Sequence, residues 1–170
     1  YVNNVPLTDK SFFADKEPVT HDCWGMYATP QSESLLLEVL PLIQDTFNVK
    51  LHPTFSFTRI YWEGSELKPH RDRPSCEYSA SVCIDVDPEP WSIWYDNEEL
   101  VLNPGDLIVY KGCEVTHWRT PFKGKQQIQI FLHYVDQNGP YASEALDGRP
   151  MLGLHHAKKH VVPVQPKPID

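Results

Sequence analysis

The sequence lacks the cysteine pattern of a disulfide-stapled or zinc-binding domain. Its four cysteines are spread along the chain and form no C-x-x-C pair, at Cys23, Cys76, Cys83 and Cys113. That spacing argues against a zinc ribbon and against a disulfide framework. It is typical of the reduced thiols of cytoplasmic proteins, so we predict a cytoplasmic location.

Long apolar runs and positive charge are also scarce. No run approaches the roughly 20 apolar residues that span a bilayer, and the N-terminus lacks a basic start followed by an apolar core. The 15 Lys and Arg residues are outnumbered by 23 Asp and Glu residues, for a formal net charge of -8. Phosphate contacts require clustered Lys and Arg, so this balance argues against a general nucleic-acid surface. We expect a soluble protein with no nucleic-acid partner and no membrane association.

What the chain does contain is enough apolar side chain for one core, because 41% of its 170 residues are hydrophobic. A chain of this size buries well over half of its unfolded surface. We predict a single domain with three segments. They are an N-terminal segment and helix over 1–54, a β-rich core over 55–135 and a C-terminal extension over 136–170.

A helix is predicted before the core, over residues 31–47. Thr29 and Pro30 supply a cap and a proline at its start. Apolar residues follow at helical spacing, at Leu36, Leu37, Leu40 and Ile43. Pro41 is expected to kink this helix or to end its first half, because proline has no amide hydrogen to donate.

The stretch from Phe55 onward consists of short runs rich in β-branched and aromatic residues. Gly, Pro, Asp or Asn residues separate the runs, as expected of turns. Several short strands at close spacing predict a sandwich or a barrel, and hence a mainly β protein with flanking helices. The runs are FSFTRIYWE, EYSASVCIDV, PWSIWYD, ELVLN, DLIVYK and QQIQIFLHYV.

A candidate metal site lies within this β-rich stretch. Residues i and i+2 of an extended segment point to the same side, so His70 and Asp72 can converge on one ion. The third ligand must come from a distant strand, and His117 and His133 are both candidates. His117 is favoured because it begins a strand after a turn, where the mouth of a barrel would lie. His133, in the middle of a strand, is more simply a hydrogen-bonded or inward-facing histidine.

Two imidazoles and one carboxylate suit an octahedral iron(II) and leave three positions open for a chelating cosubstrate and dioxygen. The same ligands also fit a zinc-dependent hydrolase, although no Glu is placed by a motif as its general base. An isolated His-x-Asp is common. The β context, the Pro-Gly-Asp turn and the later Thr-His-Trp-Arg step are what favour a metal site here.

The segments RIYWEGSELKPHRDRP and LNPGDLIVYKGCEVTHWR resemble the iron(II)/2-oxoglutarate-dependent oxygenases, in particular the prolyl-4-hydroxylase-like branch with its small bacterial and phage-type members. The resemblance covers about residues 55–135. It implies a double-stranded β-helix, a cupin-like jelly roll, with an N-terminal helix packed on one sheet. It also implies that His70, Asp72 and His117 bind iron(II).

The same resemblance implies an activity. Dioxygen would oxidise 2-oxoglutarate to succinate and carbon dioxide while an unactivated C–H bond of a substrate is hydroxylated. The substrate would be a small molecule or a peptide, with a prolyl residue or an amino-acid-like compound as the first expectation.

The chain departs from this family at the cosubstrate. Members usually place an Arg or Lys on the last core strand, where this sequence has Gln127 and Gln129. Strand alternation turns these glutamines toward the barrel interior and turns Ile128, Ile130 and Leu132 toward the helix. A desolvated C5 carboxylate still needs a cation or several donors. Arg119, on the same side as His117, is therefore the first candidate to bind it.

Several other residues are weaker candidates. Tyr61, Gln127 and Gln129 are predicted to support the cosubstrate, and Arg73 and Tyr95 to contact the substrate. Three of the candidates have a plainer interpretation: an ion pair for Arg119 and for Arg73, and core or sheet packing for Tyr95. The alternative function is a non-catalytic cupin-like module that keeps the metal ligands but serves as a metal-binding or structural protein. The missing cation on the last strand is the single feature that favours it.

Overall fold

The computed structural model describes residues 13–15, 20–86 and 90–154. One helix, α1 (Pro30–Phe47), precedes most of the strands, and two short 3-10 segments are η2 (Pro74–Cys76) and η3 (Ala142–Gly148). The strands are β1 (Phe13–Asp15), β2 (Thr20–Tyr27), β3 (Leu51–His70), β4 (Tyr78–Val86), β5 (Ile93–Tyr95), β6 (Glu98–Leu100), β7 (Leu107–Tyr110), β8 (His117–Arg119) and β9 (Gln126–Asp136).

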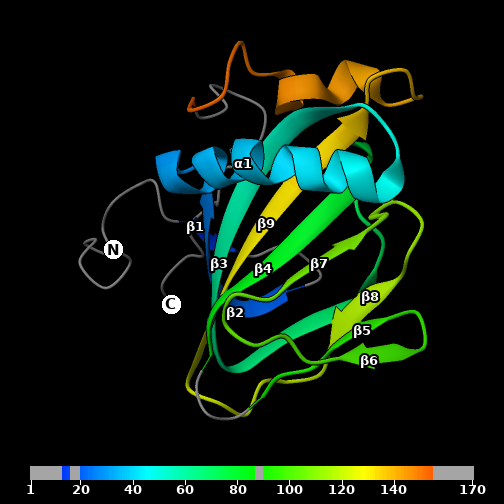
Figure 1. Ribbon diagram of the computed structural model, residues 1–170. Helices are drawn as coiled ribbons and strands as arrows, with labels where there is room; N and C mark the ends of the chain where they lie inside the picture. The colour runs from blue at the N-terminus through cyan, green and yellow to red at the C-terminus, as the bar shows by residue number, and fades with distance from the viewer. Residues whose placement is uncertain (1–12, 16–19, 87–89, 155–170) are drawn as a thin grey trace, which may run out of the picture.

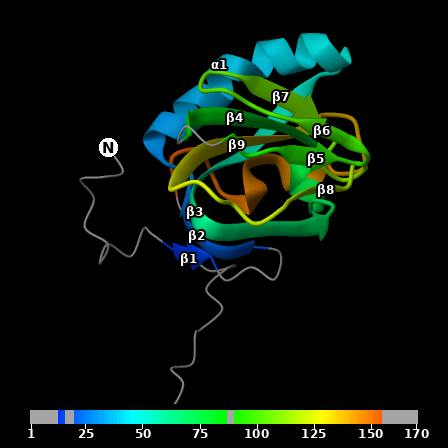
Figure 2. The same ribbon diagram turned by 90° about the horizontal axis from the view of Figure 1, so that it is seen from below.

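The long strand β3 serves two antiparallel layers. Its first part pairs with β9, and its last residues pair with β8 through His70 opposite His117. The strand order β6-β5-β8-β3-β9-β4-β7, with β2 on the other edge of β3, therefore curls into a major sheet (β2, β3, β9, β4, β7) and a minor sheet (β6, β5, β8 and the end of β3). Figure 2 shows β5, β6 and β8 as a layer apart from β4 and β9. The predicted double-stranded β-helix, or jelly roll, is confirmed.

Helix α1 begins at the predicted cap and covers the outer face of the major sheet. The Thr29 hydroxyl accepts a hydrogen bond from the Ser32 amide at 3.1 Å, and Pro30 occupies the first turn. Figure 1 shows the helix crossing β3, β9 and β4. Leu36 and Ile43 are fully buried there, in a cluster with Leu132 of β9. This cluster is the main apolar core.

Two details of the helix differ from the prediction. The helix continues through Pro41 to Phe47, so this proline does not end its first half. Pro41 lies on the solvent side, as does Leu37, which is 49% exposed. The carbonyl of Leu37 that loses its intrahelical partner to Pro41 can therefore meet water, which lowers the cost of an internal proline. Leu37 does not share the buried face of Leu36 and Ile43.

The extension beyond β9 is held against the core by two ion pairs, of which the one between Arg149 and Glu33 is buried. Arg149 donates to Glu33 of α1 at 2.7 Å and to the Thr54 carbonyl of β3 at 2.8 Å. Asp147 of η3 accepts hydrogen bonds from the Tyr27 hydroxyl and from Arg73. The predicted extension is thus packed as far as residue 154, and its remainder lies outside the described residues. No helix in the described part of the chain is long and apolar enough to cross a membrane.

Candidate metal centre

The predicted metal ligands meet where the end of β3 pairs with the start of β8. The Nε2 atoms of His70 and His117 each lie 3.6 Å from Oδ1 of Asp72. One ligand atom from each of the three residues lies within 4.8 Å of the others. The structure therefore brings together the His-Asp-His set that the sequence predicts, with His117 rather than His133 as its third member.

Backbone carbonyls fix the orientation of both imidazoles. Nδ1 of His70 lies 2.8 Å from the Lys68 carbonyl, and Nδ1 of His117 lies 3.2 Å from the Val115 carbonyl. A carbonyl can only accept, so each Nδ1 carries the proton. Each Nε2 is then left with a lone pair directed toward Asp72, which is the arrangement found in metal-binding histidines.

Burial keeps these histidines neutral. Desolvation lowers the pKa of His117, and desolvation together with the neighbouring His117 lowers the pKa of His70. Neutral imidazole is the form that coordinates a metal. Two neutral imidazoles and one carboxylate on one side of a point fit the facial set of a non-haem iron(II).

Arg119, two residues along β8 from His117, is a buried cation. Its side chain is among the largest fully buried ones, and the residue is 2% exposed. Nη1 donates to the Trp91 carbonyl at 2.7 Å, and the guanidinium lies 4.6 Å from the centre of the Trp91 ring. Nη2 has no hydrogen-bond partner within the described part of the chain, and no described carboxylate pairs with Arg119. The predicted alternative, a structural pair with Glu, is thus not seen among these residues.

Other buried polar atoms without a described partner surround the same strands. They are Tyr61 Oη, Tyr95 Oη, Gln127 Oε1 and Gln129 Nε2. Tyr61 of β3 lies directly opposite Gln127 of β9. Burial raises the pKa of both tyrosines. The positive charges of Arg59 and then Arg119 oppose that rise at Tyr61, and the positive charge of Arg119 opposes it at Tyr95.

Buried polar groups are normally paired, so a set of unpaired ones around an unbalanced cation is unusual. Three of these atoms belong to donors, in Tyr61, Tyr95 and Gln129. Together with Arg119 they fit a desolvated anion, and a carboxylate of 2-oxoglutarate is such a group.

The two faces of β9 are divided as predicted. Ile130 and Leu132 pack toward α1. On the opposite face, Gln129 accepts a hydrogen bond from Ser81 of β4 at 3.2 Å. The glutamines that replace the expected cation therefore do point between the two sheets.

The two predicted substrate residues lie in different surroundings. Tyr95 is buried beside the metal residues, with its ring 5.8 Å from that of His117. Arg73 follows Asp72 directly, but its Nη1 and Nη2 atoms donate to Asp147 at 2.7 and 2.9 Å. This is the ion pair that the sequence left open as the alternative for Arg73.

Three tryptophans near the metal residues lie on different sides of the minor sheet. Trp91 is buried against Tyr61 and Arg119, a role that no sequence pattern indicated. Trp94 and Trp118 stack on each other at 5.7 Å. Alternation with Tyr95 and with His117 places this stack on the outer side of the minor sheet, away from the metal residues.

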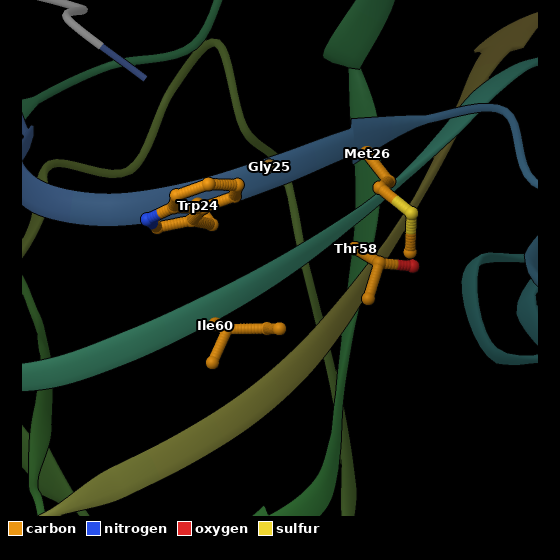
Figure 3. Close-up of a pocket in the computed structure, with 5 residues that line it drawn as sticks. All are labelled: Trp24, Gly25, Met26, Thr58 and Ile60. Atoms are coloured by element: carbon orange, nitrogen blue, oxygen red, sulfur yellow. The ribbon is translucent and has the colours of Figure 1, made fainter. Parts of the chain in front are cut away.

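One small hollow lies elsewhere. It is a shallow surface depression lined by Trp24, Gly25, Met26, Thr58 and Ile60. Figure 3 shows these side chains gathered along β2 and β3. Thr58 and Ile60 alternate with Tyr61, so the hollow is on the outer face of the major sheet and is not part of the metal centre.

Comparison with known proteins gives structural likeness only. No family model matches the chain, and no curated protein matches its sequence. A 2OG-Fe(II) oxygenase family oxidoreductase from Burkholderia pseudomallei is similar in structure, with a TM-score of 0.57, 16% identity and 72% of each chain covered.

Two prolyl hydroxylases are similar to the same degree. The prolyl-4-hydroxylase of Pseudomonas putida has a TM-score of 0.58 at 16% identity, covering 74% of this chain and 77% of its own. The viral collagen prolyl hydroxylase of Paramecium Bursaria Chlorella virus-1 has a TM-score of 0.57 at 12% identity, covering 69% and 80%. At the level of fold, the resemblance to the 2OG-Fe(II) oxygenases that the sequence indicated is confirmed.

Proposed function

We propose that this chain is an iron(II)- and 2-oxoglutarate-dependent dioxygenase that hydroxylates an unactivated C–H bond. The observation that carries the proposal is the position of Arg119. A buried cation without a described counter-ion lies two residues from His117, on the same side of β8. The metal set and an anion-binding group therefore face one interior, as a chelating dicarboxylate requires.

Each residue of this interior has a definite role in the proposal. His70, Asp72 and His117 hold iron(II), which when bound supplies the activation of dioxygen. Arg119 binds the C5 carboxylate of 2-oxoglutarate as a charge-assisted donor. Tyr61, Gln127 and Gln129 complete the polar surroundings of that carboxylate. Burial of these groups keeps water away and strengthens each contact.

In the overall reaction, 2-oxoglutarate, dioxygen and a substrate C–H group give succinate, carbon dioxide and a substrate C–OH group. Tyr95 is the better of the two proposed substrate contacts, because its hydroxyl has no described partner and its ring stacks near His117. Arg73 is already engaged by Asp147. Two of the similar structures are prolyl hydroxylases, which makes peptidyl proline the first substrate to test.

The test is anaerobic addition of iron(II) and then 2-oxoglutarate to the purified protein. We expect a visible charge-transfer band as the cosubstrate chelates the metal, and succinate formation when dioxygen is admitted. In Arg119→Ala the band should require about 10 to 100 times more 2-oxoglutarate, since a hydrogen bond to a charged group contributes about 1.5–3 kcal/mol. Lys123→Ala, which removes an exposed cation from the loop before β9, is the matched control.

The alternatives give different results. A non-catalytic cupin-like module would bind metal without forming succinate, and a zinc-dependent hydrolase would show no band with 2-oxoglutarate. A folded, iron-loaded protein that gives no band contradicts the proposal. The feature that favoured the non-catalytic module, the missing cation on β9, is weakened because Arg119 of β8 supplies a cation inside the barrel.

A further inference from the structure

The two carboxylate oxygens of Asp72 have different neighbours. Oδ1 lies 3.6 Å from the Nε2 atoms of both His70 and His117. Oδ2 lies on the other side, 3.5 Å from the hydroxyl of Ser79 on β4. A carboxylate turns about its Cβ–Cγ bond unless its second oxygen is held, so the surroundings of Oδ2 decide how Oδ1 is presented.

Backbone closes the space beside Oδ2. A Cβ atom added to Gly112 would lie 2.5 Å from Oδ2 of Asp72 and 3.0 Å from the Ser79 hydroxyl. The Gly112 carbonyl also accepts the Asp72 amide at 2.9 Å. Only glycine allows the chain to run this close to the carboxylate. The Asp72 side chain is therefore confined between Gly112 and Ser79.

Ser79 is in turn held by His133. Nδ1 of His133 lies 2.9 Å from the Ser79 hydroxyl, and the Ser79 residue is 0% exposed. The His133 ring is fixed by its neighbours, with the Phe55 ring centre 4.5 Å away and the Phe131 ring parallel to it at 6.5 Å. His133 was also a candidate metal ligand from sequence, and one of its ring nitrogens lies within 4.8 Å of ligand atoms of Asp72 and Cys76, but its Nδ1 is engaged by the Ser79 hydroxyl.

The Ser79 hydroxyl can donate only one hydrogen bond, so the direction of its contact with His133 determines whether it can donate to Asp72. The Ser79 hydroxyl has one proton, and four groups lie near it: Nδ1 of His133, the Cys76 carbonyl at 3.1 Å, Oδ2 of Asp72 and the Tyr110 hydroxyl. When Nδ1 of His133 donates to the hydroxyl, the hydroxyl proton is left for the oxygen acceptors, which include Oδ2 of Asp72. When Nδ1 accepts instead, that proton is consumed and Ser79 donates no hydrogen bond to Asp72. The protonated Nδ1 is therefore the form that supports Asp72.

We propose that Ser79 and His133 are positioning residues for the metal centre: His133 donates to the Ser79 hydroxyl, which orients Asp72 so that Oδ1 faces the metal. The inference rests on the metal site of the proposed function. It adds two residues, from β4 and β9 of the major sheet, that act through a ligand without touching the metal. Loss of a partner of this kind typically lowers metal affinity or activity by about 10-fold to 100-fold.

The test compares Ser79→Ala with Ser81→Ala. Both serines are 0% exposed and lie two positions apart on β4, but Ser81 donates to Gln129 instead of Asp72. Cobalt(II) is titrated as a spectroscopic substitute for iron(II), and the affinity and the visible d–d bands are recorded. We expect Ser79→Ala to lower the affinity about 10-fold to 100-fold and to shift the bands, with Ser81→Ala unchanged in both.

A second pair of variants tests His133 directly and covers the case in which Ser79→Ala fails to fold. His133→Asn keeps a donor near the place of Nδ1 and should retain most of the affinity. His133→Phe keeps an aromatic ring between Phe55 and Phe131 but removes the donor, and should lose affinity like Ser79→Ala. Equal cobalt(II) affinity and equal spectra in His133→Asn and His133→Phe overturn the inference.

Failure of the proposed function is separable from failure of this inference. If the wild-type protein binds cobalt(II) but gives no charge-transfer band with iron(II) and 2-oxoglutarate, the function is wrong while the variants still report on Asp72. If the wild-type protein binds no cobalt(II), both are overturned.

Discussion

The two faces of β9 differ in how completely their polar groups are paired. On the face toward α1, Leu132 is fully buried and the Tyr134 hydroxyl donates to the Leu36 carbonyl at 2.8 Å. On the face between the sheets, Gln127 and Gln129 each carry a buried atom with no described partner. Alternating residues of one strand thus serve two purposes. The outer face stabilises the fold, and the inner face is left incomplete in a way that a ligand can complete.

Loss of packing on the outer face should give the largest change in stability. Leu132→Ala removes a fully buried side chain from the cluster with Leu36 and Ile43. We expect the free energy of unfolding to fall by about 2–5 kcal/mol, measured by urea denaturation. Metal affinity of the protein that remains folded should not change. A parallel loss of metal affinity would show that the two faces are not independent.

A methyl group added beside Asp72 should weaken metal binding more than it destabilises the fold. Gly112→Ala places a methyl group against Oδ2 of Asp72 and the Cys76 carbonyl, which lie 2.5 and 2.3 Å from the added Cβ position. We expect about 1–3 kcal/mol of destabilisation from overpacking, together with a loss of metal affinity. Cobalt(II) titration and thermal melting measure both effects. Lys111→Ala, one residue away, should leave the metal affinity intact.

Removing the buried cation should separate function from stability. Arg119→Met takes an unbalanced charge out of the interior, so the unfolding free energy should stay the same or rise. The affinity for 2-oxoglutarate, measured from the charge-transfer band, should fall about 10-fold to 100-fold. A clear loss of stability without a loss of 2-oxoglutarate affinity would identify Arg119 as a structural residue.

Two buried tyrosines, one on each face of β9 and β3, give the smallest expected effects and the most closely matched pair of variants. Tyr134→Phe removes a hydroxyl that is hydrogen-bonded on the outer face, and should cost about 1 kcal/mol of stability. Tyr61→Phe removes one on the inner face, beside the cations of Arg59 and Arg119, and should cost less stability while weakening 2-oxoglutarate binding. Both residues are 0% exposed. Equal losses of stability in the two variants would contradict the division between the faces.

Local patterns predicted most of the fold. The runs read as strands correspond to β3, β4, β5, β6, β7 and β9, because turn residues and period-2 alternation are local signals. The cap at Thr29 and the start of α1 were predicted for the same reason. Of the two outcomes predicted for Pro41, an end of the first half of the helix is wrong, since the cost of an internal proline depends on whether the freed carbonyl of Leu37 contacts water, and that is decided by packing.

The candidate site was predicted in part. The spacing of His70 and Asp72, with His117 at a strand start, is visible along the chain. The engagement of Arg73 by Asp147 was not predictable, because the partner lies in an extension with no periodic pattern. The contact between Ser79 and His133 was equally hidden, since it depends on the register that sets these residues opposite each other in β4 and β9.

The sequence by itself determined which residues alternate to each side of each strand, and hence that two imidazoles, a carboxylate and Arg119 share an interior. Only the tertiary structure decided which polar groups are paired. Arg73 forms an ion pair with Asp147, and His133 hydrogen-bonds to Ser79. Within the described chain Arg119 contacts only the Trp91 carbonyl and ring. The reason is that alternation is a property of neighbouring residues, whereas the pairing of a buried charge depends on segments far apart in the chain.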